Sequence, residues 1–248
     1  MTLYIFPNTL GNRRVDLLPA GISEVLPKLQ GLIAESDRGG RTFLSLWKVQ
    51  EIHKFPIAVL SKNARSVKAW DFYLEPIVKK QENWGLVSDS GLPCIADPGA
   101  GLVRRARDLN LPIQAFSGPC SITLALMLSG LPGQNFTFLG YLPQNPRERE
   151  RCIKSSAGKQ HTQICIETPY RNVHTFQALL EVLPGHADLC VGIDLTGDQE
   201  FVSTRSVDTW LQSKDIDQVT QKITKTPANF SFPYSEIMNG EIKRGIFV

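Results

Sequence analysis

Apolar residues occur along the chain in two patterns: short continuous runs, and longer stretches in which they recur at helical spacing. The run at 85–87 ends in turn residues, as is typical of a buried strand. Apolar residues then share one helical face between 102 and 109, with charged residues opposite, and a further strand is predicted at 113–116. The order strand, long loop, helix, strand predicts part of a wound α/β sheet.

The same patterns extend over the rest of the chain. Further strands are predicted at 3–6, 32–35, 57–60, 163–166, 189–193 and 226–232. Helical faces are predicted at 67–77 and 176–183, and the segment 122–129 is apolar nearly all round, which predicts a buried helix. A chain of 248 residues is long enough for two cores, so we expect an N-terminal α/β domain at 1–116 and a C-terminal one at 120–248.

The candidate chemistry lies in the loops at 88–101 and 117–121, because open α/β sheets bind ligands beyond the carboxyl ends of their strands. The first loop is far longer than the roughly 2–6 residues that a structural turn needs. Its glycines allow backbone to approach a ligand, and Asp89 and Asp97 can accept hydrogen bonds from an ammonium or a hydroxyl group. The alternative is a decorated turn without function. Neither loop carries a GxGxxG or GxxxxGK[ST] motif, which argues against a nucleoside triphosphate site.

Two segments resemble a known family. Residues 87–99, V-S-D-S-G-L-P-C-I-A-D-P-G, are similar to the V-S-D-A-G-x-P-x-I-S-D-P-G segment of the tetrapyrrole (corrin/porphyrin) methylase superfamily. The resemblance is closest to the branch that methylates a ribose 2′-hydroxyl of small-subunit ribosomal RNA, the 16S ribosomal RNA (cytidine 2′-O)-methyltransferase I type. Residues 117–121, S-G-P-C-S, resemble that branch's P-G-P-S/C-A/S loop, and shorter matches extend the resemblance over roughly residues 3 to 232.

The resemblance implies a two-domain methyltransferase in which each domain is a sheet flanked by helices and S-adenosylmethionine lies in the interdomain cleft. The residues that it assigns to the cofactor are Pro7, Ser88, Asp89, Ser90, Leu92, Ile95, Ala96, Gly118, Pro119, Ser121, Ile166, Leu195, Thr196, Pro227 and Ala228. Three carboxylates at predicted strand ends, Asp89, Glu35 and Glu167, are candidate bases for the attacking hydroxyl.

The RNA-binding candidates are three arginines in matched motifs, Arg38, Arg41 and Arg171. Guanidinium groups suit phosphate because their forked donors match its oxygens. Without the resemblance, a solvated helix start is the favoured interpretation of the segment 36–41. It is also the favoured interpretation of the mixed-charge segment 146–151, and the alternative there is that its three arginines at alternate positions contact RNA phosphate. The partner implied by the resemblance is ribosomal RNA or the small ribosomal subunit.

The chain departs from the family pattern in three places. The E-H of the E-H-N motif is replaced at 61–62, the charge pattern changes at 193–197, and the tail 233–248 has no counterpart that we can place. These departures keep a non-catalytic RNA-binding relative as an alternative. A methylase of a tetrapyrrole ring is the other alternative, and the absence of its G-x-G-x-G loop at 7–12 argues against it.

Composition adds bounds on location and partners. The 27 basic and 24 acidic residues give a net charge of +3, which permits an anionic partner without requiring one. The sequence shows no signal peptide and no apolar run of the roughly 20 residues that span a bilayer. The five cysteines form no CxxC pair, so we expect a cytoplasmic protein with reduced thiols. The four histidines match no metal site. Superfamily members are usually homodimers, and the apolar segment 136–141 is a candidate interface or, equally, an internal strand.

Overall fold

The computed structural model describes residues 1–61, 63–159, 161–224 and 226–232. It divides into two compact units, Met1–Cys120 and Ser121–Val248, which are described separately below. Both are sheets flanked by helices, so the predicted α/β class is confirmed. Position 62, one of the two departures at 61–62, and the tail 233–248 lie outside the described residues.

The first unit is built on a five-stranded sheet with the order β3-β2-β4-β1-β5. Its strands are β1 (Thr2–Phe6), β2 (Gly31–Ala34), β3 (Ile57–Val59), β4 (Asn83–Val87) and β5 (Ile113–Ala115). Every neighbouring pair is parallel. Parallel strands are covered on both faces, which explains why β2 is buried at all four positions and why these strands read as continuous apolar runs.

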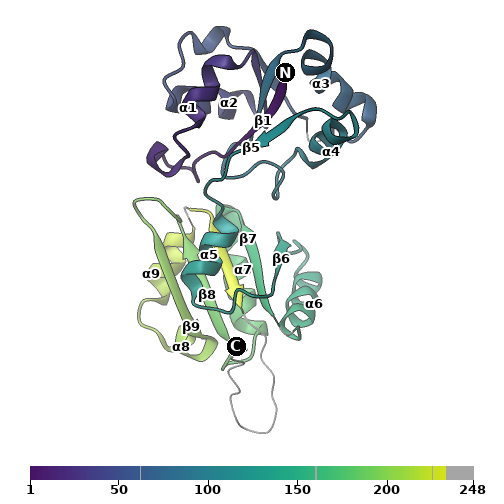
Figure 1. The fold of residues 1–248 in the computed structure, drawn as a ribbon. Coiled ribbons are helices and arrows are strands. Elements are labelled where there is room, and N and C mark those ends of the chain that lie inside the picture. The colour runs from purple at the N-terminus through teal and green to yellow at the C-terminus, as the bar shows by residue number, and fades with distance from the viewer. Residues whose placement is uncertain (62, 160, 225, 233–248) are drawn as a thin grey trace. The chain divides into compact units, whose positions relative to one another are not determined.

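Helices cover both faces of this sheet (Figure 1). They are α1 (Ile22–Val25), α2 (Asp37–Leu46), α3 (Val67–Lys80) and α4 (Ala100–Asp108), with single turns at Val15–Leu17, Leu26–Lys28 and Ile52–Lys54. One core lies between α1, α2 and the sheet, around Phe6 and Phe43, and the other between α3, α4 and the opposite face, around Leu74 and Leu86.

Helix α2 begins almost directly after β2 because its N-terminus is capped. The hydroxyl of Ser36 accepts a hydrogen bond from the backbone N–H of Gly39 at 2.9 Å, which satisfies one of the donors left unpaired in a first helical turn. The first turn of α2 is therefore held at the carboxyl-end edge of the sheet.

The second unit also contains five strands, in the order β6-β7-β10-β8-β9. They are β6 (Phe136–Gly140), β7 (Thr162–Glu167), β8 (Asp188–Ile193), β9 (Phe201–Ser206) and β10 (Ala228–Phe232). β6 and β7 are parallel, whereas β10 is antiparallel to both β7 and β8, and β9 to β8. The strand predicted at 226–232 is therefore the centre of a mixed sheet.

Four helices cover one face of this sheet and a single helix covers the other (Figure 1). The four are α6 (Pro146–Ala157), α7 (Pro169–Val182), α8 (Val207–Gln212) and α9 (Ile216–Ile223). The single helix is α5 (Ser121–Ser129). The expectation that α5 is wholly buried is wrong, since Met127 is 75% and Leu128 47% exposed. The outer face of α5 is exposed because none of the other helices in the described residues packs on it.

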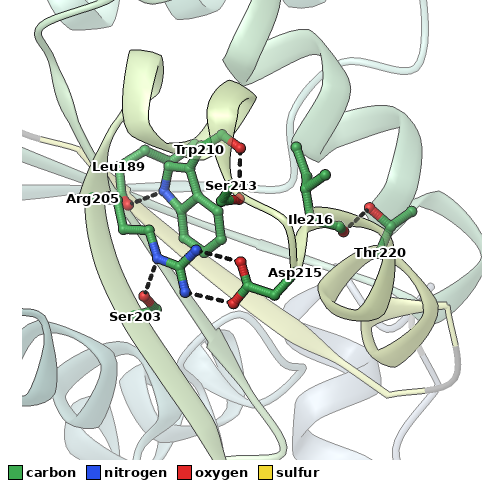
Figure 2. Close-up of polar contacts among 8 residues, drawn as sticks. All are labelled: Leu189, Ser203, Arg205, Trp210, Ser213, Asp215, Ile216 and Thr220. Carbon is green, nitrogen blue, oxygen red and sulfur yellow. Dashed lines mark hydrogen bonds and ion pairs between the residues drawn. The ribbon is translucent and has the colours of Figure 1, made fainter.

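Trp210 anchors α8 and β9 in the core of the second unit (Figure 2). Its indole N–H donates to the carbonyl of Leu189 at 2.8 Å, and its ring is fully buried. Arg205 covers the ring at 4.4 Å from the centroid and makes a forked ion pair with Asp215 at 2.6 and 2.8 Å. The guanidinium thus links the outermost strand, β9, to the turn before α9.

Candidate functional site

Three loops of the first unit meet at the carboxyl-end edge of its sheet, after the neighbouring strands β4, β1 and β5. Asn8, which follows β1, is 3% exposed and donates from its side-chain amide to the carbonyls of Ser88 at 3.0 Å and Asp89 at 3.2 Å. Its backbone N–H donates to the carbonyl of Gly91 at 2.7 Å. Asn8 therefore fixes the long loop after β4 against the loop after β1.

Glycine is required where the third loop approaches the first. A Cβ on Gly118, in the loop after β5, would lie 2.1 Å from the Cβ of Pro7, a distance that real side chains do not adopt. Gly91 has a φ of +66°, which side chains rarely adopt, and a Cβ there would lie 3.5 Å from the carbonyl oxygen of Pro119. These close approaches hold backbone from all three loops together at one edge.

The carboxylate of Asp89 is held against the first turn of α2. Its Oδ1 accepts a hydrogen bond from the hydroxyl of Ser36 at 2.8 Å, and its backbone N–H donates to Oε2 of Glu35 at 3.3 Å. A Cβ on Gly39 would lie 1.8 Å from the same Oδ1, so only glycine leaves room for the carboxylate here. The Asp89 side chain is exposed, and its direction is fixed by Ser36.

The second unit has a comparable edge, where β7 and β8 end and the antiparallel β10 begins. Ala228 pairs with both Glu167 and Ile193, and Asn229 pairs with Ile166. The chain leaves β8 through a tight turn in which the N–H of Thr196 donates to Oε2 of Glu200 at 2.6 Å. Predicted cofactor residues from three strands or their loops are therefore neighbours at this edge.

Backbone strain is concentrated in the two long loops. Eight described residues other than glycine have a positive φ, and four of them are Cys94, Ala96, Asp194 and Thr196, with values of 71°, 64°, 48° and 70°. A positive φ is most unusual for the β-branched Thr196. Since strained backbone gathers at ligand sites and switches, this distribution favours both loops as functional elements.

Glu167 and Arg171 form a buried ion pair that ties together three elements. The Glu167 side chain is inaccessible to solvent and accepts from Thr175 Oγ1 at 3.1 Å, while its Oε2 lies 3.0 Å from Arg171 Nη2. The same nitrogen donates to the carbonyl of Leu142 at 2.6 Å. Both residues thus hold the loop after β6 against the start of α7.

The other two predicted RNA-binding arginines differ in their surroundings. Arg41 is engaged within the unit, as its Nε donates to Asp37 at 3.0 Å and its Nη1 donates to the carbonyl of Ile52 at 2.5 Å. Arg38 is exposed near the N-terminus of α2, and its side chain has no hydrogen bond or ion pair among the described residues.

The thiols of Cys94 and Cys165 are poor nucleophiles. Burial, aided by Asp97, raises the pKa of the Cys94 thiol to about 11, and burial also raises the pKa of Cys165 far above its ordinary value. Over the described part of the chain, three or more His, Cys, Asp or Glu side chains nowhere gather in a way that suits a metal ion. None of the described helices is both long and apolar enough to cross a membrane.

The predicted cofactor residues fall into two groups. Nine are in the first unit, at or within the loops after β1, β4 and β5, and the other six are in the second unit. In the first unit Leu92, Ile95 and the Asp89 carboxylate belong to the long loop after β4, which is bonded to the loop after β1. Backbone polar groups, aliphatic side chains and a carboxylate suit a ligand with an adenosine and an ammonium group.

Sequence reasoning did not identify three residues that shape this site. Asn8 joins two loops, and Ser36 and Gly39 set the position of Asp89. The serine is a recognisable helix cap, but its bond to a residue 53 positions away has no local signal.

Comparison with solved structures identifies the fold class. The chain matches uroporphyrin-III C-methyltransferase from Thermus thermophilus with a TM-score of 0.56 over 94% of both chains, at 15% sequence identity. No protein-family model matches the chain. The chain therefore has the fold of the tetrapyrrole methylases, as the resemblance of residues 87–99 implied.

Within that class, the sequence relatives are proteins named ribosomal RNA small subunit methyltransferase I. The relative from Vibrio cholerae is 34% identical over 133 residues, which are 52% of this chain and 46% of that protein. The relative from Thermotoga maritima is 28% identical over 179 residues, 72% of this chain and 77% of that protein. The chain therefore spans about half the length of the first relative in its alignment, and most of the second.

Proposed function

We propose that the chain is an S-adenosylmethionine-dependent methyltransferase that methylates a ribose 2′-hydroxyl of small-subunit ribosomal RNA. The observation that carries the proposal is that the motifs shared with this branch fall on the functional edges of two sheets with the superfamily fold. The names of the sequence relatives support RNA rather than a tetrapyrrole as substrate.

In this proposal the residues of the first unit orient the cofactor and supply the base that deprotonates the ribose hydroxyl. When bound, S-adenosylmethionine supplies a methyl group carried by a sulfonium. Gly118, Pro7 and the loop after β4 bind it mainly through backbone groups, and Asp89 accepts the proton of the attacking hydroxyl. Asp89 suits this role because its carboxylate is exposed and held by Ser36 through one oxygen.

The two other candidate bases are less suited to proton transfer. Glu167 has no solvent-accessible side-chain surface and is bound by Arg171 and Thr175, so it has no oxygen within reach of a substrate. Glu35 is half-buried and accepts from the N–H of Asp89, which suits a residue that positions the loop. We therefore assign Glu167 and Glu35 to the framework of the site and Asp89 to the chemistry.

A methyl-transfer assay with labelled S-adenosylmethionine tests the proposal directly. The acceptors are assembled small ribosomal subunits, bare ribosomal RNA and a porphyrinogen, each with the wild type and with Asp89→Asn. We expect label in a ribose-methylated nucleoside, and at least about a 100-fold loss of rate in the variant. Label in the porphyrinogen would support the tetrapyrrole methylase, and RNA binding without transfer to any acceptor would support the non-catalytic relative.

A further inference from the structure

Tyr170 is the most exposed large hydrophobic residue in the described part of the second unit. It is 94% exposed, although it follows β7 by only three residues at the edge that carries the predicted cofactor residues. Pro169 occupies the first position of α7 and fixes the backbone there, so the ring projects from a rigid helical turn. An aromatic ring held in this way loses little conformational freedom when a ligand covers it.

The surroundings of Tyr170 are polar and basic rather than apolar. His174 lies one turn further on the same face of α7 and is exposed, and Thr168 before it is exposed as well. An isolated ring among polar groups lacks the contiguous apolar area of a protein-docking patch. These surroundings suit stacking against a planar polar group better than docking of an apolar protein surface.

Helix α6, which begins at the same edge of the sheet, carries two arginines without a side-chain partner among the described residues. Helices α6 and α7 follow β6 and β7, which are parallel neighbours, and the two helices pack together. Arg147 and Arg151 are one turn apart on α6, both are exposed, and neither guanidinium has a hydrogen bond or ion pair among the described residues. Glu150 between them is already paired with Lys154 at 2.7 Å, so it does not neutralise them.

We propose that Tyr170 is a stacking platform for an unpaired nucleobase of the RNA, and that Arg147 and Arg151 hold the phosphates beside it. Bases that are splayed out of single-stranded segments stack on exposed aromatic rings, while cations follow the backbone. The inference rests on the proposed function, since it names how that RNA is held. It moves the RNA contacts from Arg41 and Arg171, which the fold uses internally, to residues that are free to bind.

The test measures equilibrium binding of a fluorescent, unstructured single-stranded RNA of about 15 nucleotides to the full chain. Tyr170→Ala should weaken binding about 5- to 150-fold, and Tyr170→Phe should retain it because stacking needs only the ring. Phe72→Ala is the matched control, since Phe72 is an aromatic on the first unit that is 68% exposed, and its affinity should equal that of the wild type. Arg147→Gln and Arg151→Gln should each lower the salt dependence by about one unit of slope.

Equal RNA affinities for Tyr170→Ala and Phe72→Ala would overturn the inference. A change in the sedimentation of Tyr170→Ala without a change in its RNA affinity would also overturn it, because that result would indicate a protein contact. Parallel methyl-transfer assays separate this failure from failure of the proposed function. A wild type that methylates RNA, with an unchanged KM in Tyr170→Ala, removes only the stacking platform. A wild type that neither binds nor methylates RNA removes both.

Discussion

Replacing Gly39 by alanine should separate the stability of the protein from its activity. Gly39 lies in the first turn of α2, where alanine is the better helix former by about 0.5–1 kcal/mol. The new Cβ would be 1.8 Å from Oδ1 of Asp89, so the carboxylate must move by more than about 1 Å to reach an ordinary contact distance. That movement breaks the exposed bond from Ser36, which contributes about 0.5–1.5 kcal/mol. The two effects nearly cancel, and we expect little change in Tm.

The expected effect on catalysis is much larger. A misplacement of about 1 Å costs on the order of 100-fold in rate, and the whole contribution of a general base is about 100- to 10,000-fold. Gly39→Ala should therefore lower kcat for methyl transfer about 100-fold. Thr42→Ala, an exposed substitution in the same helix, is the control and should retain wild-type activity.

A double variant decides whether Gly39 acts through Asp89. If it does, Gly39→Ala combined with Asp89→Asn should be no slower than Asp89→Asn alone, because the carboxylate that Gly39 positions is already absent. Rate losses that multiply in the double variant would refute the reasoning, and so would wild-type kcat in Gly39→Ala itself. Single-turnover methyl transfer with unfolding curves for each variant provides both readouts.

Four further outcomes follow from the same contacts. Gly118→Val should abolish binding of S-adenosylmethionine in calorimetry while the first unit stays folded, because the Cβ of the new valine would displace the loop at Pro7. Unchanged affinity would remove this loop from the site. Arg38→Ala should lower the salt slope of RNA binding by about one unit, whereas Arg41→Ala should lower Tm because its bonds are internal. Arg205 holds the pKa of Asp215 at about 2, so their pairing stabilises the fold above about pH 4 and is lost as pH falls toward 2; the Tm difference between wild type and Asp215→Asn should shrink over that range. If the apolar segment 136–141 forms a homodimer interface, sedimentation should show a two-fold dimer that Phe136→Ser weakens, and a monomer near 28 kDa would contradict it.

The buried strands and the long loops were predictable because their signals are local. Continuous apolar runs marked the parallel strands of the first sheet, and turn residues marked where each strand ends. The strand β9 was missed because serine, threonine and arginine occupy both of its faces. It lies at the edge of the second sheet, where one side needs no partner strand and polar residues are tolerated.

The roles of the arginines were not predictable from spacing. A guanidinium fork suits a phosphate, a carboxylate and a backbone carbonyl alike, so the pattern around Arg41 reads the same for RNA binding and for internal support. Only the fold shows that Arg41 bonds to the carbonyl of Ile52 and Arg171 to that of Leu142. Arg38 is exposed and has no side-chain partner among the described residues, which leaves it available to bind, and this property has no sequence signal.

The turn after β8 has strained backbone at the positions where the sequence departs from the family pattern, 193–197. Side-chain identities have changed at Ile193, Asp194 and Gly197, but the chain still leaves β8 through positive φ at Asp194 and Thr196. Holding Thr196 in that conformation costs on the order of 1–3 kcal/mol, which the fold offsets with the bond from its N–H to Glu200. Since strained backbone gathers at ligand sites, this turn supports the proposal that a ligand contacts the main chain here. In the same proposal the charge of the substrate is recognised elsewhere, at Arg38 and on α6.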